Sequence, residues 1–281
     1  DALPICHAAM PGTNGQRPRF LQSILRSKIL DVTGNVLLLS ALIWLVLRGA
    51  ESQGYNWQWY RVPQFIYAFG DDGFSAGPIL QGLGITLHIT WMSLILTYII
   101  GLVTALLRLS PSIGGRIVAR FYLETTRNTP LLVQLFFVYF IVAPPLQLNR
   151  LFAAVLALSL FEGSYASEIY RAGIKSIDKG QWEAGSSLGL NTYQLYRLVI
   201  LPQAIPRILP PLTSQAVSLI KDSSLVSVIA VYEMTMRANA IVAETFLVFE
   251  VYFTIALFYL IITVIVSQLA GLMERKIQVP S

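Results

Sequence analysis

Four polar or charged side chains interrupt stretches that are otherwise long and apolar: Gln134, Glu162, Lys221 and Asp222. A charge in an apolar environment costs roughly 3 kcal/mol, so such residues usually serve a function. The Glu162 carboxylate could hold an ammonium group, and Lys221 could attract a carboxylate. Gln134 could hydrogen-bond a ligand or an adjacent helix. These groups suit a small zwitterion, although a partner on a neighbouring helix or a water-filled cavity would explain Glu162 equally well.

Spacing separates some of these charges from others. Lys221 and Asp222 are adjacent, so on a helix they point to different faces and are not each other's main partner. Glu168 and Arg171 are three residues apart, which suits a helical ion pair. We therefore predict a structural role for Glu168.

The usual catalytic side chains are scarce. Cys6 is the single cysteine, which excludes an intramolecular disulfide framework. With it, His7 and His88 leave little for a zinc or iron site. The phosphate-binding pattern G-x4-G-K-[ST] is absent. We predict no catalytic residue, no metal site and no ATP hydrolysis by the chain itself.

Composition points to a membrane protein. Hydrophobic residues make up 55% of the 281 residues and charged residues 12%, with a mean hydropathy of +0.62. Soluble domains carry about 25% charged residues, so a soluble globular enzyme is excluded, as are disordered, collagen-like and coiled-coil chains. A bilayer needs about 20 apolar residues for each helix. We predict an all-α polytopic fold with about six transmembrane helices, in the stretches Ile29–Leu47, Ile79–Leu107, Pro130–Leu148, Leu151–Ile169, Ile208–Val231 and Val251–Leu272.

The N-terminal region allows two interpretations. We predict a cytoplasmic tail at 1–28 and a transmembrane helix at 29–48. The alternative is a cleaved signal peptide with Arg17–Lys28 as its basic region, but Arg48 directly after the apolar run and a first residue other than Met argue against it. Asp1–Gly15 is expected to be a tag or a processed end.

The cations predict the orientation, because cytoplasmic loops carry an excess of lysine and arginine. With the N-terminus in the cytoplasm, the basic residues of the tail, of 108–127, of 171–207 and of the C-terminal end all lie inside. Both termini are then cytoplasmic, and the net charge of +5 needs no nucleic acid. The outside carries only Arg48, Arg61, Arg150 and Arg237.

The outer segment 49–78 is rich in aromatic residues, which favour the headgroup zone. We expect a helix lying on the outer membrane surface, with a docking surface for an external partner as the alternative. Its aromatic residues are Tyr55, Trp57, Trp59, Tyr60, Phe65, Tyr67, Phe69 and Phe74.

The longest inner segment, about 171–207, exceeds what is needed to join two helices. Its pattern predicts two short helices with a turn between them. Asp178 can cap the first, and Gly189 with Asn191 can form the turn. Thr192 can cap the second, which we expect to run through Tyr193–Leu201 and to end before Pro202.

This segment carries a spaced motif, Glu183-Ala184-Gly185-x-x-x-Gly189, then nine residues, then Val199-Ile200-Leu201-Pro202. It resembles the EAA loop of ABC importer permeases, in which E-A-A, three residues, G, nine residues and I-x-L-P follow one another. Gly185 and Val199 depart slightly from the pattern. The resemblance implies that this helix pair docks into a cleft of a cytoplasmic ATPase. Its small residues would allow close approach of the two backbones, and Glu183 would pair with a basic residue of the ATPase. The alternative is a turn that packs on the permease itself. The implied coupling residues are Glu183, Ala184, Gly185, Gly189, Leu201 and Pro202.

Three further stretches resemble the polar amino acid uptake permeases: 124–134, 154–174 and 218–229. In the first, Asn128 replaces a glycine, and Thr129 and Pro130 suit the N-cap and first position of a helix. The resemblance implies a five-helix ABC type I importer core at 79–276 plus one added N-terminal helix. It also favours a structural or gating role for the Lys221–Asp222 pair. The candidates for the substrate path are Glu162, Gln134, Lys221, Asp222 and Ser223.

The resemblance also implies partners. ABC ATPase subunits would bind the ATP and magnesium, a second permease, related or identical, would complete the path, and an external amino-acid-binding protein would deliver the substrate. The expected location is the bacterial inner membrane, in contact with lipid. The alternatives are an ABC permease for another solute, such as a metal complex or a sugar, and a channel that works without ATP.

Overall fold

The computed structural model describes residues 28–52, 54–70 and 73–277, in two compact units divided after Trp57. Each unit is described by itself. The predicted tail at 1–28, including Asp1–Gly15, lies outside the described residues except for its last position. Its cytoplasmic placement stays a prediction.

The first unit contains helix α2 (Lys28–Ser52), formed where the first apolar stretch predicts a helix. Its window Val32–Gly49 is apolar and has no buried residue within the unit. Leu37 and Trp44 are 70% and 56% exposed. A helix that is apolar all round needs a nonpolar solvent, and its length fits a bilayer.

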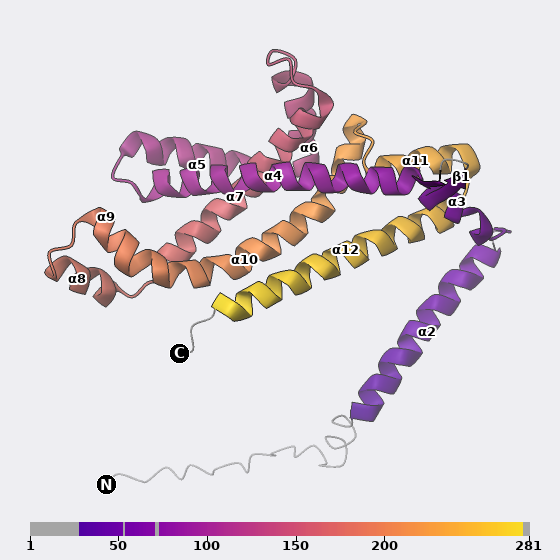
Figure 1. Ribbon diagram of the computed structural model, residues 1–281, viewed down its shortest axis with the longest axis horizontal. Helices are drawn as coiled ribbons and strands as arrows, with labels where there is room; N and C mark the ends of the chain where they lie inside the picture. Colours follow the sequence, from indigo (N-terminus) through magenta and orange to yellow (C-terminus); the bar gives the residue numbers. More distant parts are fainter. Residues whose placement is uncertain (1–27, 53, 71–72, 278–281) are drawn as a thin grey trace, which may run out of the picture. The chain divides into compact units, whose positions relative to one another are not determined.

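The second unit is built on two long helices, α4 (Pro78–Leu109) and α7 (Arg150–Lys175), which pack along each other (Figure 1). Small residues let them approach: a Cβ added at Gly101 would lie 2.7 Å from the Cβ of Ala166. Close contact through small residues is typical of helices packed in membranes. The pair forms the centre of the unit.

Two further helices complete this packing, α10 (Leu201–Asp222) and α12 (Val248–Ile277), which pack against each other. Among the described residues, α2, α4, α7 and α12 are each long and apolar enough to cross a membrane, and a bent helix pair that includes α10 is a fifth candidate. The prediction of an all-α membrane fold is confirmed, and its count of about six spans is approximate.

The predicted span Ile208–Val231 is not one straight helix. After α10 comes a 3₁₀ segment, η4 (Ser223–Ile229), then Ala230 in the left-handed region at φ 57°, then α11 (Met234–Thr245). The stretch Thr192–Ile229 and α11 are bent by 50° relative to each other, so the bend lies at the C-terminal end of the predicted span. The buried Glu233 caps α11, accepting from the backbone N–H groups of Thr235 and Met236 at 2.9 and 2.8 Å. A buried capping carboxylate lets the chain start a new helix there.

The predicted span Pro130–Leu148 is shorter than expected. The helical stretch runs over α6 (Leu131–Phe137) and a π-helical turn, η2 (Val138–Val142). Before it lies the amphipathic α5 (Ile113–Arg127). The predicted capping is wrong by one position: Pro130 itself is the N-cap, and the Thr129 hydroxyl donates to the carbonyl of Thr125 at 2.8 Å.

The expected outer-surface helix within 49–78 is also wrong. The second unit begins with two short helical turns, η1 (Trp59–Arg61) and α3 (Pro63–Ile66). An antiparallel hairpin follows, β1 (Tyr67–Gly70) paired with β2 (Gly73–Ala76). Alternating aromatic residues favour a strand over a helix here, and the rings of Phe69 and Phe74 meet across the strands at 5.8 Å.

Candidate functional site

The segment 171–207 contains the predicted helix pair, α8 (Lys179–Ser187) and α9 (Thr192–Leu195) (Figure 1). Asp178 caps α8, accepting from the Gly180 N–H at 2.7 Å. Gly189 takes φ 72°, the left-handed conformation that glycine adopts at least cost.

The second cap differs from the prediction. Asn191, not Thr192, caps α9 in a capping box with Gln194, with reciprocal bonds of 2.9 and 3.0 Å. Asparagine is the stronger N-cap, and glutamine three residues later completes the box.

The second helix also does not stop before Pro202. It continues from α9 through a π-helical turn, η3 (Tyr196–Ile200), into α10, in which Pro202 lies in the first turn. The π-helical turn before it, in which the Leu201 N–H donates to the Tyr196 carbonyl, carries the helix past a residue that has no N–H to donate. One helical stretch therefore links the loop to the membrane helix that carries Asp222.

The motif residues divide between the surface and the interior of the loop. Glu183, Ala184, Gly189, Leu201 and Pro202 are exposed. Gly185 is buried, and a Cβ added there would lie 2.4 Å from Cδ1 of Leu195, whose side chain would have to shift. Its small size thus brings α8 and α9 together, whereas we had expected it to face a partner.

Three more apolar side chains are exposed on this loop, and the sequence analysis missed them: Leu188 at 78%, Tyr193 at 66% and Leu198 at 63%. An exposed apolar patch often marks a protein-binding surface. Their only signal in the sequence is apolar residues in a segment expected outside the membrane.

Glu162 lies within the helix packing, 2% exposed. Its carboxylate accepts a hydrogen bond from the Gln215 amide of α10. The Asp222 carboxyl lies close to that of Glu162. The structure thus brings together Glu162 and Asp222, two of the predicted candidates for the substrate path. It also places Gln215 beside them, which we had not predicted.

The other candidates are placed differently. Lys221 is exposed, whereas Asp222 is half-buried, as expected for adjacent helix positions. The Ser223 hydroxyl is buried and donates to the Ile220 carbonyl at 2.7 Å. Gln134 donates to the carbonyls of Thr126 and Thr129 at 2.7 and 2.8 Å, so its amide joins α5 to α6.

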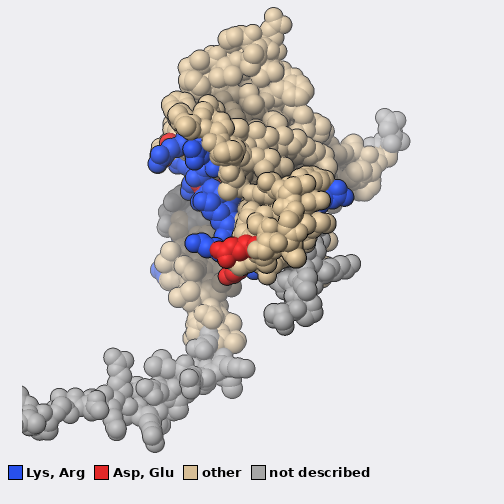
Figure 2. All heavy atoms as spheres, turned by 90° about the vertical axis from the view of Figure 1, so that its left-hand side faces the viewer, with Lys and Arg blue, Asp and Glu red and all other residues tan. Residues whose placement is uncertain are grey.

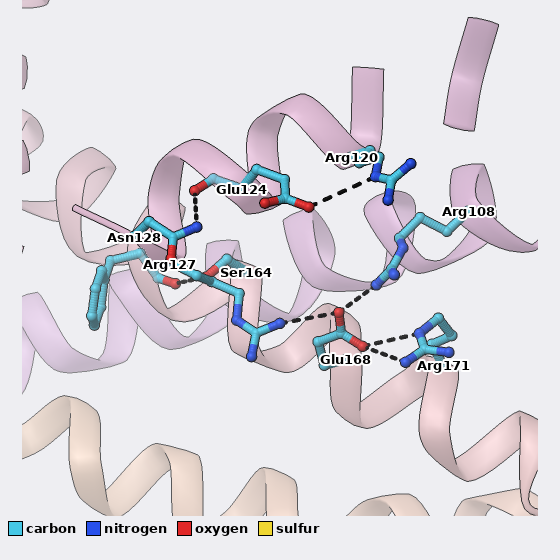
Figure 3. A network of polar contacts seen from close by, with 9 residues as sticks. Arg108, Arg120, Glu124, Arg127, Asn128, Ser164, Glu168 and Arg171 are labelled. Carbon is cyan, nitrogen blue, oxygen red and sulfur yellow. Dashed lines mark hydrogen bonds and ion pairs between the residues drawn. The ribbon is translucent and has the colours of Figure 1, made fainter. Parts of the chain in front are cut away.

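The second carboxylate of α7 lies in an ionic network (Figure 3). Glu168 pairs with Arg171 at 2.8 Å, which confirms the predicted pair. It also pairs with Arg108 of α4 at 2.5 Å and with Arg127 of α5 at 3.2 Å. Figure 2 shows arginine and lysine side chains, in blue, gathered on this side of the molecule. Within the described residues, no group of three or more His, Cys, Asp or Glu could hold a metal ion.

Known proteins share this architecture. Residues 97–279 match the family described as binding-protein-dependent transport system inner membrane component. The glutamine transport system permease protein GlnP of Escherichia coli strain K12 is 39% identical over 209 residues, which cover 72% of this chain and 93% of that protein.

Solved structures agree. A chain from a crystal structure of an amino acid ABC transporter with histidines superposes with a TM-score of 0.66 at 38% identity, covering 71% of this chain and 94% of that one. A chain of a bacterial alginate ABC transporter has a TM-score of 0.63 at 16% identity and covers 93% and 100%, which shows the fold alone. The resemblance inferred from the EAA motif is confirmed, and the chain belongs to the family of binding-protein-dependent transport system inner membrane components.

Proposed function

We propose that the chain is the membrane-spanning subunit of an ATP-driven importer of polar amino acids, located in a bacterial inner membrane. The exposed Glu183 on the α8–α9 loop carries the proposal, because this loop combines a charge, an apolar patch and the spacing of the EAA motif. The likeness to a glutamine permease and to an amino acid transporter structure supports the substrate class.

Coupling would run through the loop. An ATPase subunit would bind ATP and Mg²⁺. Its cleft would receive Ala184, Leu188 and Tyr193, and a basic residue of the ATPase would pair with Glu183. Since α9, η3 and α10 are continuous, a movement of the loop would be transmitted along α10 towards Asp222. Alternating access would follow as ATP draws two such loops together.

The transport path would include Glu162, Gln215 and Asp222. A carboxylate at this position could receive the ammonium group of an amino acid once the Gln215 amide moves aside. A second permease, identical or related, would supply the opposite wall of the path, and an external binding protein would deliver the substrate. Both termini would be cytoplasmic, because this orientation places most cations inside.

The coupling role is tested with the substitution Glu183→Lys in the full transporter. We expect loss of the co-purifying ATPase and at least a tenfold drop in amino acid uptake, since the new lysine would face a basic residue of the ATPase with the same charge. The matched control is Glu244→Lys, which reverses an exposed charge on α11 and should leave both unchanged. Unchanged ATPase binding and uptake in Glu183→Lys would contradict the proposal.

A further inference from the structure

A cavity of about 350 Å³ lies where α4, α5 and α7 meet, and none of the coupling or path residues lines it. Its walls include charged groups from all three helices (Figure 3). The Tyr165 side chain of α7 also lines it. The charged residues that line it are Arg108, Arg120, Glu124, Arg127 and Glu168.

The cavity has an excess of positive charge. Glu168 is a single carboxylate shared by three guanidinium groups, those of Arg108, Arg127 and Arg171. Arg120 lies 3.7 Å from Glu124, and their side chains are 81% and 65% exposed. Such an exposed pair is weak, so Arg120 remains available to an anion from solution or from the membrane.

The arginines around the cavity are held in place before any ligand arrives. One oxygen of Glu168 binds Arg108 at 2.5 Å and Arg127 at 3.2 Å, and the other binds Arg171. The Arg127 guanidinium also lies 5.4 Å from the centre of the Tyr165 ring. Each guanidinium has five N–H donors, and these bonds use only some of them. Arginine donors fixed in this way match the oxygens of a phosphate group.

Beside the cavity, α5 presents an apolar stripe that a free anion would not need. Ile113, Ile117 and Phe121 follow one another at intervals of four residues and are 69%, 62% and 73% exposed. Ile117 lies three residues before Arg120 and so is its neighbour on the helix surface. A basic row next to an exposed apolar row is the pattern of a helix at a lipid headgroup boundary.

We propose that this cavity binds the phosphate headgroup of an anionic phospholipid, with its acyl chains along Ile113, Ile117 and Phe121. The cavity is at the end of α7 that leads into α8, which the orientation proposed above places in the cytoplasmic leaflet. Basic pockets between helices on that side suit anionic headgroups. The assignment to the cytoplasmic leaflet rests on the proposed function, whereas the binding of the headgroup does not.

The test measures lipid retained by the purified full chain with its co-purifying subunits. The protein is exchanged from mild detergent into vesicles of phosphatidylcholine, or of equal parts phosphatidylcholine and phosphatidylglycerol, and re-extracted, and bound lipid is identified by native mass spectrometry. We expect retained phosphatidylglycerol in the wild type, and about a fivefold loss in Arg120→Gln and in Arg127→Gln, since each arginine near a charged lipid contributes about a fivefold change.

Arg116→Gln is the matched control, because Arg116 is exposed on the same helix and does not line the cavity. Arg120→Gln keeps the proposal testable if Arg127→Gln fails to fold, since Arg120 takes no part in the Glu168 network. Equal retention in all variants would overturn the proposal, as would an equal loss in Arg116→Gln. If inorganic phosphate at equal concentration displaces the lipid, the cavity binds free phosphate as well as a headgroup, and the proposal of a lipid site is overturned.

A second permease copy is the other possible occupant of this face. A fluorescent label on Phe121→Cys, introduced together with Cys6→Ser so that only position 121 is labelled, distinguishes them. If the label is protected from a water-soluble quencher in vesicles of phosphatidylcholine alone, and only when the transporter is assembled, a protein covers this face. That result would overturn lipid binding. Protection that requires phosphatidylglycerol would support it. Neither result depends on whether the α8–α9 loop couples to an ATPase, so this test and the test of the proposed function can fail separately.

Discussion

Glu162 and Glu168 lie six residues apart on α7, yet their surroundings are opposite. Glu168 is 24% exposed in its side chain and faces three arginines. Glu162 is almost fully buried and meets an amide and a second carboxyl. The first arrangement supplies the countercharge that stabilises a carboxylate, whereas the second sets a carboxylate against a neutral amide and another carboxyl. One helix thus separates a group used for structure from a group suited to a ligand.

The largest effect is expected for Glu168→Gln. It removes the shared negative charge and leaves Arg108, Arg127 and Arg171 close together with only a neutral amide between them. Removing one partner of a buried charge network costs about 3–5 kcal/mol, and partial exposure lowers this to about 2–3 kcal/mol. A thermal melt in detergent should show a clear fall in melting temperature. An unchanged melting temperature would mean that the arginines do not depend on Glu168, and the contrast with Glu162 would fail.

Glu162→Gln is the matched substitution at the other position. The new amide can still hydrogen-bond Gln215 and Asp222, so we expect a melting temperature within about 2 °C of the wild type. Substrate affinity should fall about tenfold, because an ion pair between carboxylate and ammonium is replaced by a hydrogen bond from the ammonium to a neutral amide oxygen. Binding of a labelled amino acid to the detergent-purified transporter measures this. Full affinity in Glu162→Gln would remove Glu162 from the path.

The smallest effect is expected for Lys221→Gln. Lys221 adjoins Asp222 in the sequence but is exposed on the other side of α10, so its loss should change the free energy of unfolding by about 0.5 kcal/mol or less. The same melt and binding assay apply. A loss of affinity as large as that in Glu162→Gln would show that the cation belongs to the path, and the Glu162 region would then resemble the Glu168 region more closely.

Much of the candidate site could be predicted because its signals are local. The caps, turns and spacing of the α8–α9 loop depend on residues within a few positions of one another, so Asp178 and Gly189 lie where we expected them. The cap at Asn191 was missed because two good N-cap residues are adjacent, and the choice between them depends on Gln194. The continuation through Pro202 was missed because proline usually marks the end of a helix, and the π-helical turn that precedes it has no signal in the sequence.

Contacts between distant segments could not be predicted. Gln215 is 53 residues from Glu162 in the sequence, and Arg108 is 60 residues from Glu168. Which polar side chains meet depends on the rotation and depth of each helix in the packing, and small residues such as Gly101 set how closely two helices approach. The broken span after Asp222 also escaped prediction, since its apolar composition is the same in a straight helix and in a bent one.

The sequence alone determined the membrane class, the approximate spans, the loop motif and the family, because hydropathy, charge distribution and motif spacing are properties of neighbouring residues. The sequence also predicted the pair of Glu168 with Arg171, but only the tertiary structure brought Arg108 and Arg127 to that carboxylate and Gln215 to Glu162. It did so because an ion pair requires an approach of a few ångströms between groups on different helices, and packing alone sets that distance.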